Sequence, residues 1–280
     1  MNHHIPEKIL SDGLHIPSIG FGTAKLNGHE AVEVVQNAIR SGYRLIDTAF
    51  NYDNEGAVGE AIRRSPVSRS EIMVTSKLPG RYHSYEEAVK AIQESLLRTG
   101  LDYFDLYLIH WPNPEQDNYV EAWQALIDAR RWGLVRSIGV CNFLPEHLDN
   151  LKEKTGVLPT LNQIEMHPYF IQETQRSYHD ENGILTEAWS PLARARELQD
   201  DPVLAKVAEK HGKSTAQIVL RWHYQLGTIT IPKASSPERQ MENLSIFDFE
   251  LDDEDINRIS SLTKEDGRID DQNPATYEEF

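Results

Sequence analysis

Residues 106–111 read Leu106-Tyr107-Leu108-Ile109-His110-Trp111, an apolar run that ends at a histidine beside a tryptophan. A run without regular polar alternation predicts a strand covered on both faces, as strands of a parallel sheet are. Other β-rich runs recur along the whole chain. The predicted strands cover residues 18–23, 45–49, 73–78, 106–111, 137–142, 160–165, 185–192 and 228–233.

Amphipathic segments with helix start signals separate these runs. Ser84-Tyr85-Glu86-Glu87 and Ser214-Thr215-Ala216-Gln217 each predict a capping box, and Gly227 is placed to end the second of these helices. Eight strand–helix units in about 250 residues predict an α/β fold of the (β/α)8 TIM barrel type. An open doubly wound sheet is the alternative, although it usually has fewer strands.

Shorter segments flank the predicted barrel. Ser11-Asp12-Gly13-Leu14 lies between two short β-rich runs and predicts an N-terminal β-hairpin. The acidic residues from about 264 to 280 predict a C-terminal tail over the barrel mouth. No linker or low-complexity tract divides the chain, so we expect residues 1–280 to form a single domain.

Composition and charge disfavour several classes of function. A formal net charge of −16 argues against a nucleic-acid partner, whose phosphates such a surface would repel. No apolar run reaches the length of a membrane span, and the first ten residues lack the apolar core of a signal peptide. Because Cys141 is the one cysteine, no internal disulfide can form, and we expect a protein of the reducing cytoplasm.

Polar residues occur in or at the end of seven different predicted strands, where an apolar residue would be usual. The carboxyl ends of the strands in a (β/α)8 barrel meet at one mouth, so these residues together predict a site there. The seven residues are Asp47, Lys77, His110, Asn142, Gln163, Ser190 and Lys233.

Four residues at this mouth suit the protonation of an oxygen. Tyr52 follows the second predicted strand, and a free tyrosine is a weak acid with a pKa of about 10. A nearby Lys77 would favour the phenolate and ease proton release, while Asp47 would hold the ammonium. His110 would orient a carbonyl oxygen. Each also has a purely structural explanation: Asp47 and Lys77 as a buried ion pair, Tyr52 as a loop aromatic, and His110 as a core histidine. Their convergence at one mouth favours a functional site.

A second group of charges surrounds a predicted helix start. Ser236-Pro237 predicts an N-cap followed by proline at the first helical position, with Arg239 in the first turn and Lys233 upstream. Cations at the positive end of a helix are unfavourable unless an anion binds there, and a phosphate is the natural candidate. Solvated surface charge is the alternative.

Other chemistries lack the residues that they need. Gly20-Phe21-Gly22 could begin a dinucleotide-binding glycine motif, but Lys25 stands at the third glycine position. No Gly-x-Ser-x-Gly motif supports a serine hydrolase, and the histidines lack metal-ligand spacing, so no metal site is predicted. Glu165 and Glu187 are the candidates for a glycosidase pair at strand ends.

Several long motifs, in order along the chain, resemble the aldo-keto reductase family. Residues 42–49 with Tyr52 resemble its first signature, and residues 106–112 resemble the stretch that holds a catalytic histidine. Residues 138–143 and 162–169 resemble two further motifs, and residues 231–243 resemble the cofactor signature. The chain is most similar to bacterial members of the 2,5-diketo-D-gluconate reductase type.

The resemblance implies a monomeric oxidoreductase that reduces a small-molecule carbonyl substrate, an aldehyde or ketone, with NADPH, leaving NADP+. It implies that Asn142 and Gln163 hold the nicotinamide amide and that Trp189 stacks on the ring. The implied catalytic residues are Asp47, Tyr52, Lys77 and His110. The implied cofactor-binding residues are Thr23, Asp47, Asn142, Gln163, Trp189, Ser190, Leu192, Lys233, Ser235, Arg239, Glu242 and Asn243. The expected pocket residues are Ala24, Phe50, Tyr52, His110 and Trp111, with the tail near Tyr277.

The chain departs from the family pattern at three positions. Cys141 stands where a serine usually contacts the nicotinamide amide, and Ala234 stands where a serine or threonine often binds the 2′-phosphate. Phosphate binding would then depend more on Lys233, Ser235 and Arg239. Ala24 stands where many members have a large pocket aromatic, which suggests a roomier or more polar pocket.

Two other functions stay open on the sequence. A barrel that binds NADPH without catalysis would serve as a redox sensor or scaffold, because fold alone does not decide function. A hydrolytic barrel would act without any nicotinamide. The intact set of four residues favours the reductase, since a pure binding module needs no acid.

Overall fold

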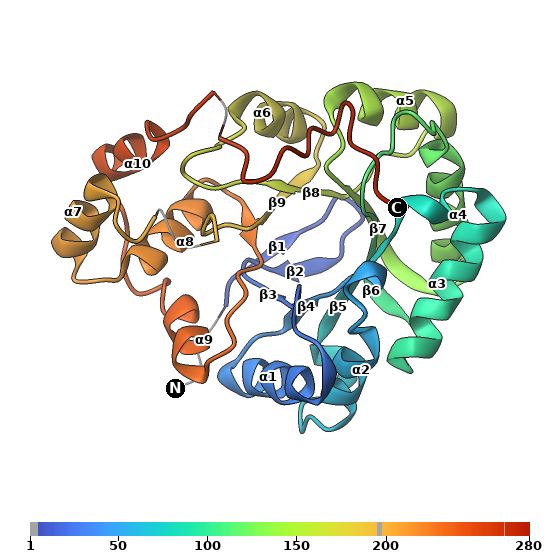
Figure 1. Ribbon diagram of the computed structural model, residues 1–280, viewed down its shortest axis with the longest axis horizontal. Coiled ribbons are helices and arrows are strands. Elements are labelled where there is room, and N and C mark those ends of the chain that lie inside the picture. The colour runs from blue at the N-terminus through green and yellow to red at the C-terminus, as the bar shows by residue number, and fades with distance from the viewer. Residues whose placement is uncertain (1–4, 195–197, 266) are drawn as a thin grey trace.

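A curled sheet of eight parallel strands forms the centre of the molecule (Figure 1). The structure, a computed structural model, describes residues 5–194, 198–265 and 267–280. Each strand is a hydrogen-bonded neighbour of the next one along the chain, which is the order that the sequence predicts. The strands are β3 (Phe21–Gly22), β4 (Leu45–Asp47), β5 (Met73–Leu78), β6 (Phe104–Ile109), β7 (Val135–Cys141), β8 (Leu161–Glu165), β9 (Leu185–Trp189) and β10 (Ile229–Thr230).

The two edges of the sheet meet, so it closes as the (β/α)8 barrel requires. Ile19 and Thr230 form a parallel bridge, and the amide of Gly20 donates to the carbonyl of Thr230 at 2.7 Å. A side chain at Gly22 would begin 2.6 Å from the carbonyl oxygen of Ile231, so the absence of a Cβ permits this close approach. β3 and β10 are shorter than the predicted runs 18–23 and 228–233. Part of the junction between them is irregular backbone around Pro232, which has no N–H to donate to a neighbouring strand.

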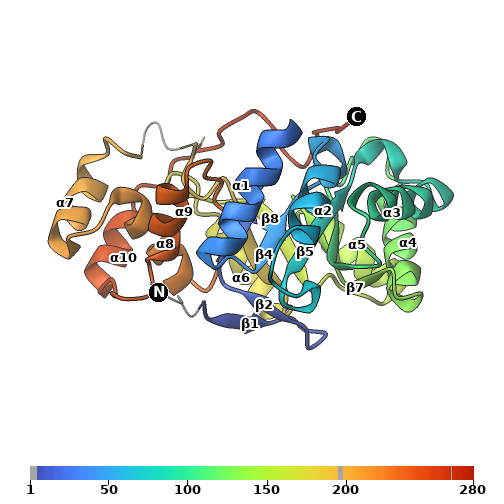
Figure 2. The same ribbon diagram turned by 90° about the horizontal axis from the view of Figure 1, so that it is seen from below.

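Helices surround the sheet on its outer face (Figure 1, Figure 2). Their apolar faces and the outer faces of the strands bury one large cluster of side chains that includes Phe104, Tyr107 and Trp123. The helices are α1 (Gly28–Ser41), α2 (Glu55–Arg63), α3 (Tyr85–Thr99), α4 (Tyr119–Arg131), α5 (Pro145–Thr155), α6 (Glu173–Glu181), α7 (Pro202–His211), α8 (Thr215–Gln225), α9 (Pro237–Leu244) and α10 (Asp253–Ser260). Within the described ranges, no helix is long and apolar enough to cross a membrane.

The helix start signals are confirmed in two places and wrong in one. Ser214 and Gln217 form the predicted capping box at α8, and Ser236 caps α9 by accepting from the amide of Arg239. Ser84 precedes α3 as expected, but its hydroxyl donates to the Glu87 carboxylate at 2.7 Å and caps no backbone amide. The charged acceptor on the next turn competes with the backbone for that hydroxyl.

The predicted N-terminal hairpin is present and closes one end of the barrel. β1 (Glu7–Ile9) pairs antiparallel with β2 (His15–Pro17) around a turn in which Gly13 has a φ of +89°. Leu10 and Ile16 of this hairpin pack against the inward-facing Leu45 and Leu106. The hairpin and the C-terminal residues lie on opposite sides of the molecule in Figure 2, so the end of the barrel opposite the hairpin is left for a site.

Two glycines in α2 give a matched test of the packing between α2 and α3. A Cβ at Gly59 would lie 1.8 Å from the carbonyl oxygen of Thr99, whereas one at Gly56 would have its nearest neighbour 3.5 Å away. We expect Gly59→Ala to lower the free energy of unfolding by roughly 1–3 kcal/mol or more, because the helices must separate. Gly56→Ala should leave it unchanged or raise it by up to about 1 kcal/mol through helix propensity. Urea denaturation of both variants measures the difference, and equal effects would contradict this account of the interface.

Candidate active site

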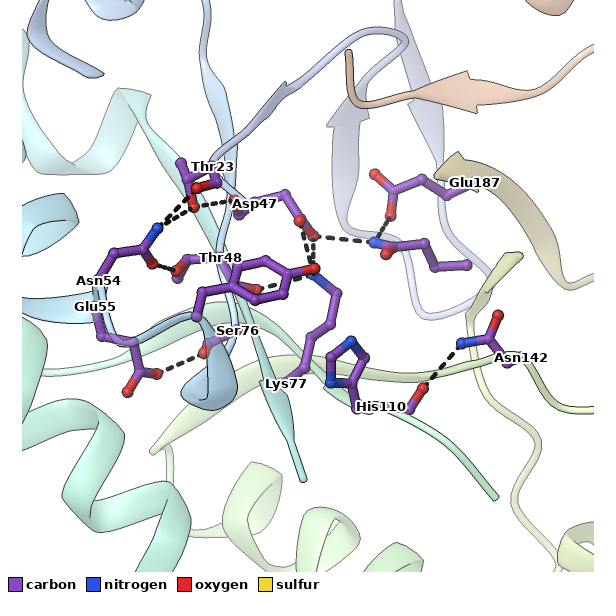
Figure 3. Close-up of polar contacts among 12 residues, drawn as sticks. Thr23, Asp47, Thr48, Asn54, Glu55, Ser76, Lys77, His110, Asn142 and Glu187 are labelled. Atoms are coloured by element: carbon purple, nitrogen blue, oxygen red, sulfur yellow. Dashed lines mark hydrogen bonds and ion pairs between the residues drawn. The ribbon is translucent and has the colours of Figure 1, made fainter. Parts of the chain in front are cut away.

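A buried ion pair lies at the carboxyl end of two neighbouring strands (Figure 3). Asp47 ends β4, and the ammonium of Lys77 in β5 lies 2.7 and 2.8 Å from its two carboxylate oxygens. The same ammonium donates to the carbonyl oxygen of Thr48 at 2.9 Å. Lys77 is fully buried and Asp47 is 1% exposed, so each charge is compensated by the other. Burial lowers the pKa of Lys77, but the net shift is upward, chiefly because of the Asp47 carboxylate, and the side chain stays cationic.

Tyr52 lies against this pair at the end of the short 3-10 segment η1 (Phe50–Tyr52). Its hydroxyl oxygen is 3.5 Å from the Lys77 ammonium, which also lies 4.9 Å from the centre of the ring. Lys77 does lower the pKa of Tyr52, as the sequence predicts, but the net shift of this pKa is upward. Burial raises the pKa of Tyr52 to about 12 although Lys77 lowers it, because desolvation of the phenolate outweighs the nearby cation. The hydroxyl is therefore protonated at neutral pH and available as a donor.

His110 follows β6 and completes the group of four. Its ring centre lies 5.9 Å from that of Tyr52, with the two rings nearly perpendicular. The Nδ1 atom of His110 lies 2.7 Å from a carboxylate oxygen of Glu279, a residue that the sequence analysis does not single out. The four residues predicted as catalytic thus lie together.

Asn142 and Trp189 form a linked pair next to His110. The indole N–H of Trp189 donates to the side-chain oxygen of Asn142 at 2.8 Å, and the Asn142 amide donates to the carbonyl of His110 at 3.1 Å. Asn142 and Ser190 directly follow β7 and β9 with φ values of +61° and +48°, a left-handed conformation uncommon outside glycine. Backbone strain of this kind often accompanies functional sites. Here the left-handed conformation changes the direction of the chain directly after each strand.

Gln163 connects the ion pair to a second buried carboxyl group. Its amide nitrogen donates to Asp47 at 3.0 Å and to Glu187 at 3.1 Å. Both amide hydrogens are used, which leaves the side-chain oxygen of Gln163 as an acceptor. Burial and the charge of Asp47 raise the pKa of Glu187, so this carboxyl holds a proton at neutral pH. Glu187 lies inside the barrel because alternate residues of a strand such as β9 point inward. This alternation is a signal in the sequence that could have placed Glu187 there.

The two glutamates considered for glycosidase chemistry have other partners. Glu165 lies 3.0 Å from His167 Nε2 and accepts from the amide of Ile269 at 2.6 Å. Glu187 bonds with Gln163. Their carboxyl groups thus belong to separate polar networks.

The residues expected to bind a phosphate lie at the start of α9. Lys233, Ser235 and Arg239 are exposed, and within the part of the chain that the structure describes neither cation has an ion-pair partner. Farther along α9, Glu242 is half-buried and Asn243 is buried. Thr23 donates to the carbonyl of Asp47 at 2.9 Å, and Leu192 is half-buried after β9.

The expected pocket residues differ in their surroundings. Trp111 packs on Tyr277 of the C-terminal tail, with ring centres 4.4 Å apart. Ala24 is half-buried. Phe50 is 4% exposed and packs against Tyr82 and under the guanidinium of Arg98, so most of its surface faces the core.

Comparison with known proteins identifies the family. The model of the aldo/keto reductase family matches residues 18–264. This chain belongs to the aldo/keto reductase family. It is 50% identical to 2,5-diketo-D-gluconic acid reductase B of Corynebacterium sp. over 99% of both chains. It is 46% identical to a glyoxal reductase of Bacillus subtilis, with 92% of each chain covered.

Solved structures of similar proteins have the same fold. A Gox0644 mutant in complex with NADPH superposes with a TM-score of 0.94 at 41% identity, covering 98% of this chain and 99% of that one. An aldo-keto reductase of Bombyx mori in complex with NADP gives a TM-score of 0.88 at 37% identity, covering 96% and 95%. The resemblance drawn from the sequence is confirmed, and these two relatives hold the cofactor that it implies.

The raised pKa of Glu187 predicts how stability changes with pH. Above about pH 4.5, the ordinary pKa of the group, the unfolded chain loses this proton while the folded chain keeps it. The unfolded state then binds fewer protons, so this contribution to stability is lost as the pH rises towards the folded pKa. We expect the Tm of the wild type to fall more between pH 5 and 8 than that of Glu187→Gln, by roughly 3 °C or more.

The matched control for this comparison is Glu250→Gln, because Glu250 is exposed. Its Tm should follow the wild type at every pH. Parallel Tm curves for the wild type and Glu187→Gln would show that Glu187 is ionised in the folded protein.

Proposed function

We propose that this aldo/keto reductase reduces an aldehyde or ketone with NADPH and that Tyr52 is the general acid. The observation that carries the proposal is the position of the Tyr52 hydroxyl, 3.5 Å from the buried Lys77–Asp47 pair and protonated at neutral pH. A protonated phenol beside a fixed cation can release its proton as negative charge develops on a substrate oxygen. His110 lies across from Tyr52 and orients that oxygen.

The residues around the mouth fit NADPH. No donor to the Gln163 amide oxygen is found in the described part of the chain, so this oxygen can accept from the nicotinamide carboxamide, and two carboxyl groups fix the orientation of the side chain. Among the residues that the structure describes, Lys233 and Arg239 have no carboxylate partners, and these cations at the N-terminus of α9 suit a 2′-phosphate. When bound, NADPH would supply the hydride that is transferred to the carbonyl carbon.

The protein's own residues would supply the proton and the orientation. Tyr52 donates its proton to the substrate oxygen, which becomes the alcohol, and Lys77 stabilises the phenolate left behind until water returns a proton. Asp47 keeps the Lys77 ammonium in place through bonds of 2.7 and 2.8 Å. The names of the relatives, a diketo acid reductase and a glyoxal reductase, favour dicarbonyl compounds as the first substrates to test.

We also infer that the C-terminal residues cover this mouth and that residues 1–280 act as one domain. Contacts of the tail support this. The amide of Ile269 donates to Glu165 at the end of β8, and the amide of Glu115, after β6, donates to Glu278 at 2.7 Å. The tail therefore bonds with the end of β8 and with the loop after β6, and Figure 1 shows it passing α6 on the way to its end.

Replacement of the proposed acid tests the reaction directly. Tyr52→Phe should lower kcat for carbonyl reduction by about 10²- to 10⁴-fold, because the phenyl ring has no proton to donate. NADPH binding should stay within a factor of about three, since the tyrosine does not contact the phosphates. Loss of NADPH absorbance with aldehydes, ketoses and α-dicarbonyls measures the rate. Equal turnover by Tyr52→Phe would contradict the assignment, and NADPH binding without any turnover in the wild type would favour a sensor or scaffold.

A second pair of variants tests the phosphate site. Arg239→Ala should weaken NADPH binding by about 10- to 100-fold, the loss expected for one charge-assisted contact, and should change NADH binding much less. Arg258→Ala, which removes an exposed arginine paired with Glu254, is the matched control and should change neither. Fluorescence titration measures both dissociation constants. An unchanged NADPH affinity in Arg239→Ala would place the phosphate elsewhere.

A further inference from the structure

The C-terminal residues place a carboxylate next to the proposed substrate-orienting histidine. Glu279 is 8% exposed, whereas its neighbour Phe280 is 78% exposed. One oxygen of the Glu279 carboxylate lies 2.7 Å from His110 Nδ1 and accepts from the side chain of Asn51 at 2.8 Å. The other oxygen accepts from the backbone amide of Gly80 at 3.1 Å. A residue near the end of the acidic tail thus lies against three separate segments of the chain.

The space that holds Glu279 is shaped for its backbone as well. The side chain of Asn113 donates to the carbonyl of Glu279 at 2.8 Å and accepts from its amide at 3.2 Å. A Cβ at Gly80 would lie 2.2 Å from the Asn113 amide and 2.5 Å from the Glu279 carbonyl oxygen. Only a glycine leaves room there, so Gly80 and Asn113 form a specific binding site for this part of the tail.

The groups around the Glu279 carboxyl favour its ionised form. The two hydrogen bonds that its oxygens accept come from N–H groups of Asn51 and Gly80, and the third neighbour, His110 Nδ1, lies 2.7 Å from one of these oxygens. Burial raises the pKa of Glu279, but His110, Asn51 and Gly80 lower it by more, so the net shift is downward. An ionised carboxylate can only accept hydrogen bonds, so it favours the His110 tautomer that carries its proton on Nδ1, the atom that faces it.

We propose that Glu279 is a positioning residue for the reduction, acting through His110. By holding the proton of His110 on Nδ1 and fixing the plane of the ring, it directs Nε2 to the substrate oxygen. Glu279 also bonds with Asn51, the residue before Tyr52, so one carboxylate aligns both sides of the proposed reaction centre. This inference rests on the proposed function, since the orientation matters only if His110 contacts a substrate carbonyl.

The direct test replaces Glu279 with its neutral isostere and uses the adjacent glutamate as a control. Glu279→Gln should lower kcat for NADPH-dependent carbonyl reduction by about 10- to 100-fold, because the ring of His110 loses its fixed orientation. The Kd for NADPH should change less than about twofold, since neither Lys233 nor Arg239 is affected. Glu278→Gln should match the wild type, because Glu278 accepts from the amide of Glu115 and a glutamine oxygen can do the same.

A spectroscopic measurement separates positioning from a general structural effect. Nitrogen-15 NMR of histidine-labelled full-length protein reports which ring nitrogen carries the proton, and the His110 signals are identified by their loss in His110→Gln. We expect Nδ1 of His110 to be protonated in the wild type, and we expect a shift towards the Nε2-protonated tautomer in Glu279→Gln. Glu279→Asp, which keeps the charge on a shorter side chain, should recover part of both kcat and the wild-type tautomer.

The outcomes distinguish failure of this inference from failure of the proposed function. If the wild type and Glu278→Gln reduce carbonyls and Glu279→Gln does so equally fast, the reductase stands and the role of Glu279 is wrong. An unchanged His110 tautomer in Glu279→Gln would overturn the inference as well, whatever the rate. If Glu279→Gln is faster than the wild type, Glu279 competes with substrate for His110, which also contradicts a positioning role. A wild type that reduces no carbonyl would instead refute the proposed function.

Discussion

The buried ion pair between Lys77 and Asp47 is the interaction on which the rest of the mouth depends. Neither charge has appreciable access to water, and breaking such a pair by removing one partner typically costs about 3–5 kcal/mol. Each ion has further partners, since Lys77 also donates to Thr48 and Asp47 also accepts from Gln163. These bonds fix the ammonium of Lys77 and the carboxylate of Asp47 in position, and the neighbouring side chains pack around them.

Burial and that fixed pair together set the protonation of the two titratable groups beside it, with burial the larger effect at both. Asp47 disfavours a second anion, and together with burial this keeps Glu187 neutral. Lys77 favours an anion at Tyr52, but burial has the larger effect and the phenol keeps its proton. If Tyr52 lost its proton during a reaction, the Lys77 ammonium would already be in position to stabilise the phenolate. The site is thus arranged to stabilise a negative charge that exists only during the reaction.

The periodic features of the sequence predicted most of this arrangement. Apolar runs such as 106–111 located the strands, and polar residues at their ends located Asp47, Lys77 and His110. The prediction failed where local patterns compete with surroundings that only the folded chain provides. Ser84 bonds with Glu87 and caps no helix, and desolvation reverses the net effect expected at Tyr52. Glu279 gave no local signal at all, because its partners are far from it in the sequence.

The long sequence separation of these partners has a consequence for how the protein acquires its activity. Asn51 and Glu279 are 228 positions apart and Asp47 and Gln163 are 116 apart, although each pair is joined by a hydrogen bond. The entropy of closing such long loops must be overcome before these bonds contribute, whereas helices such as α3 need only local contacts. During refolding, helical structure should therefore return before the mouth is assembled, and recovery of turnover reports the last stage of folding rather than the first.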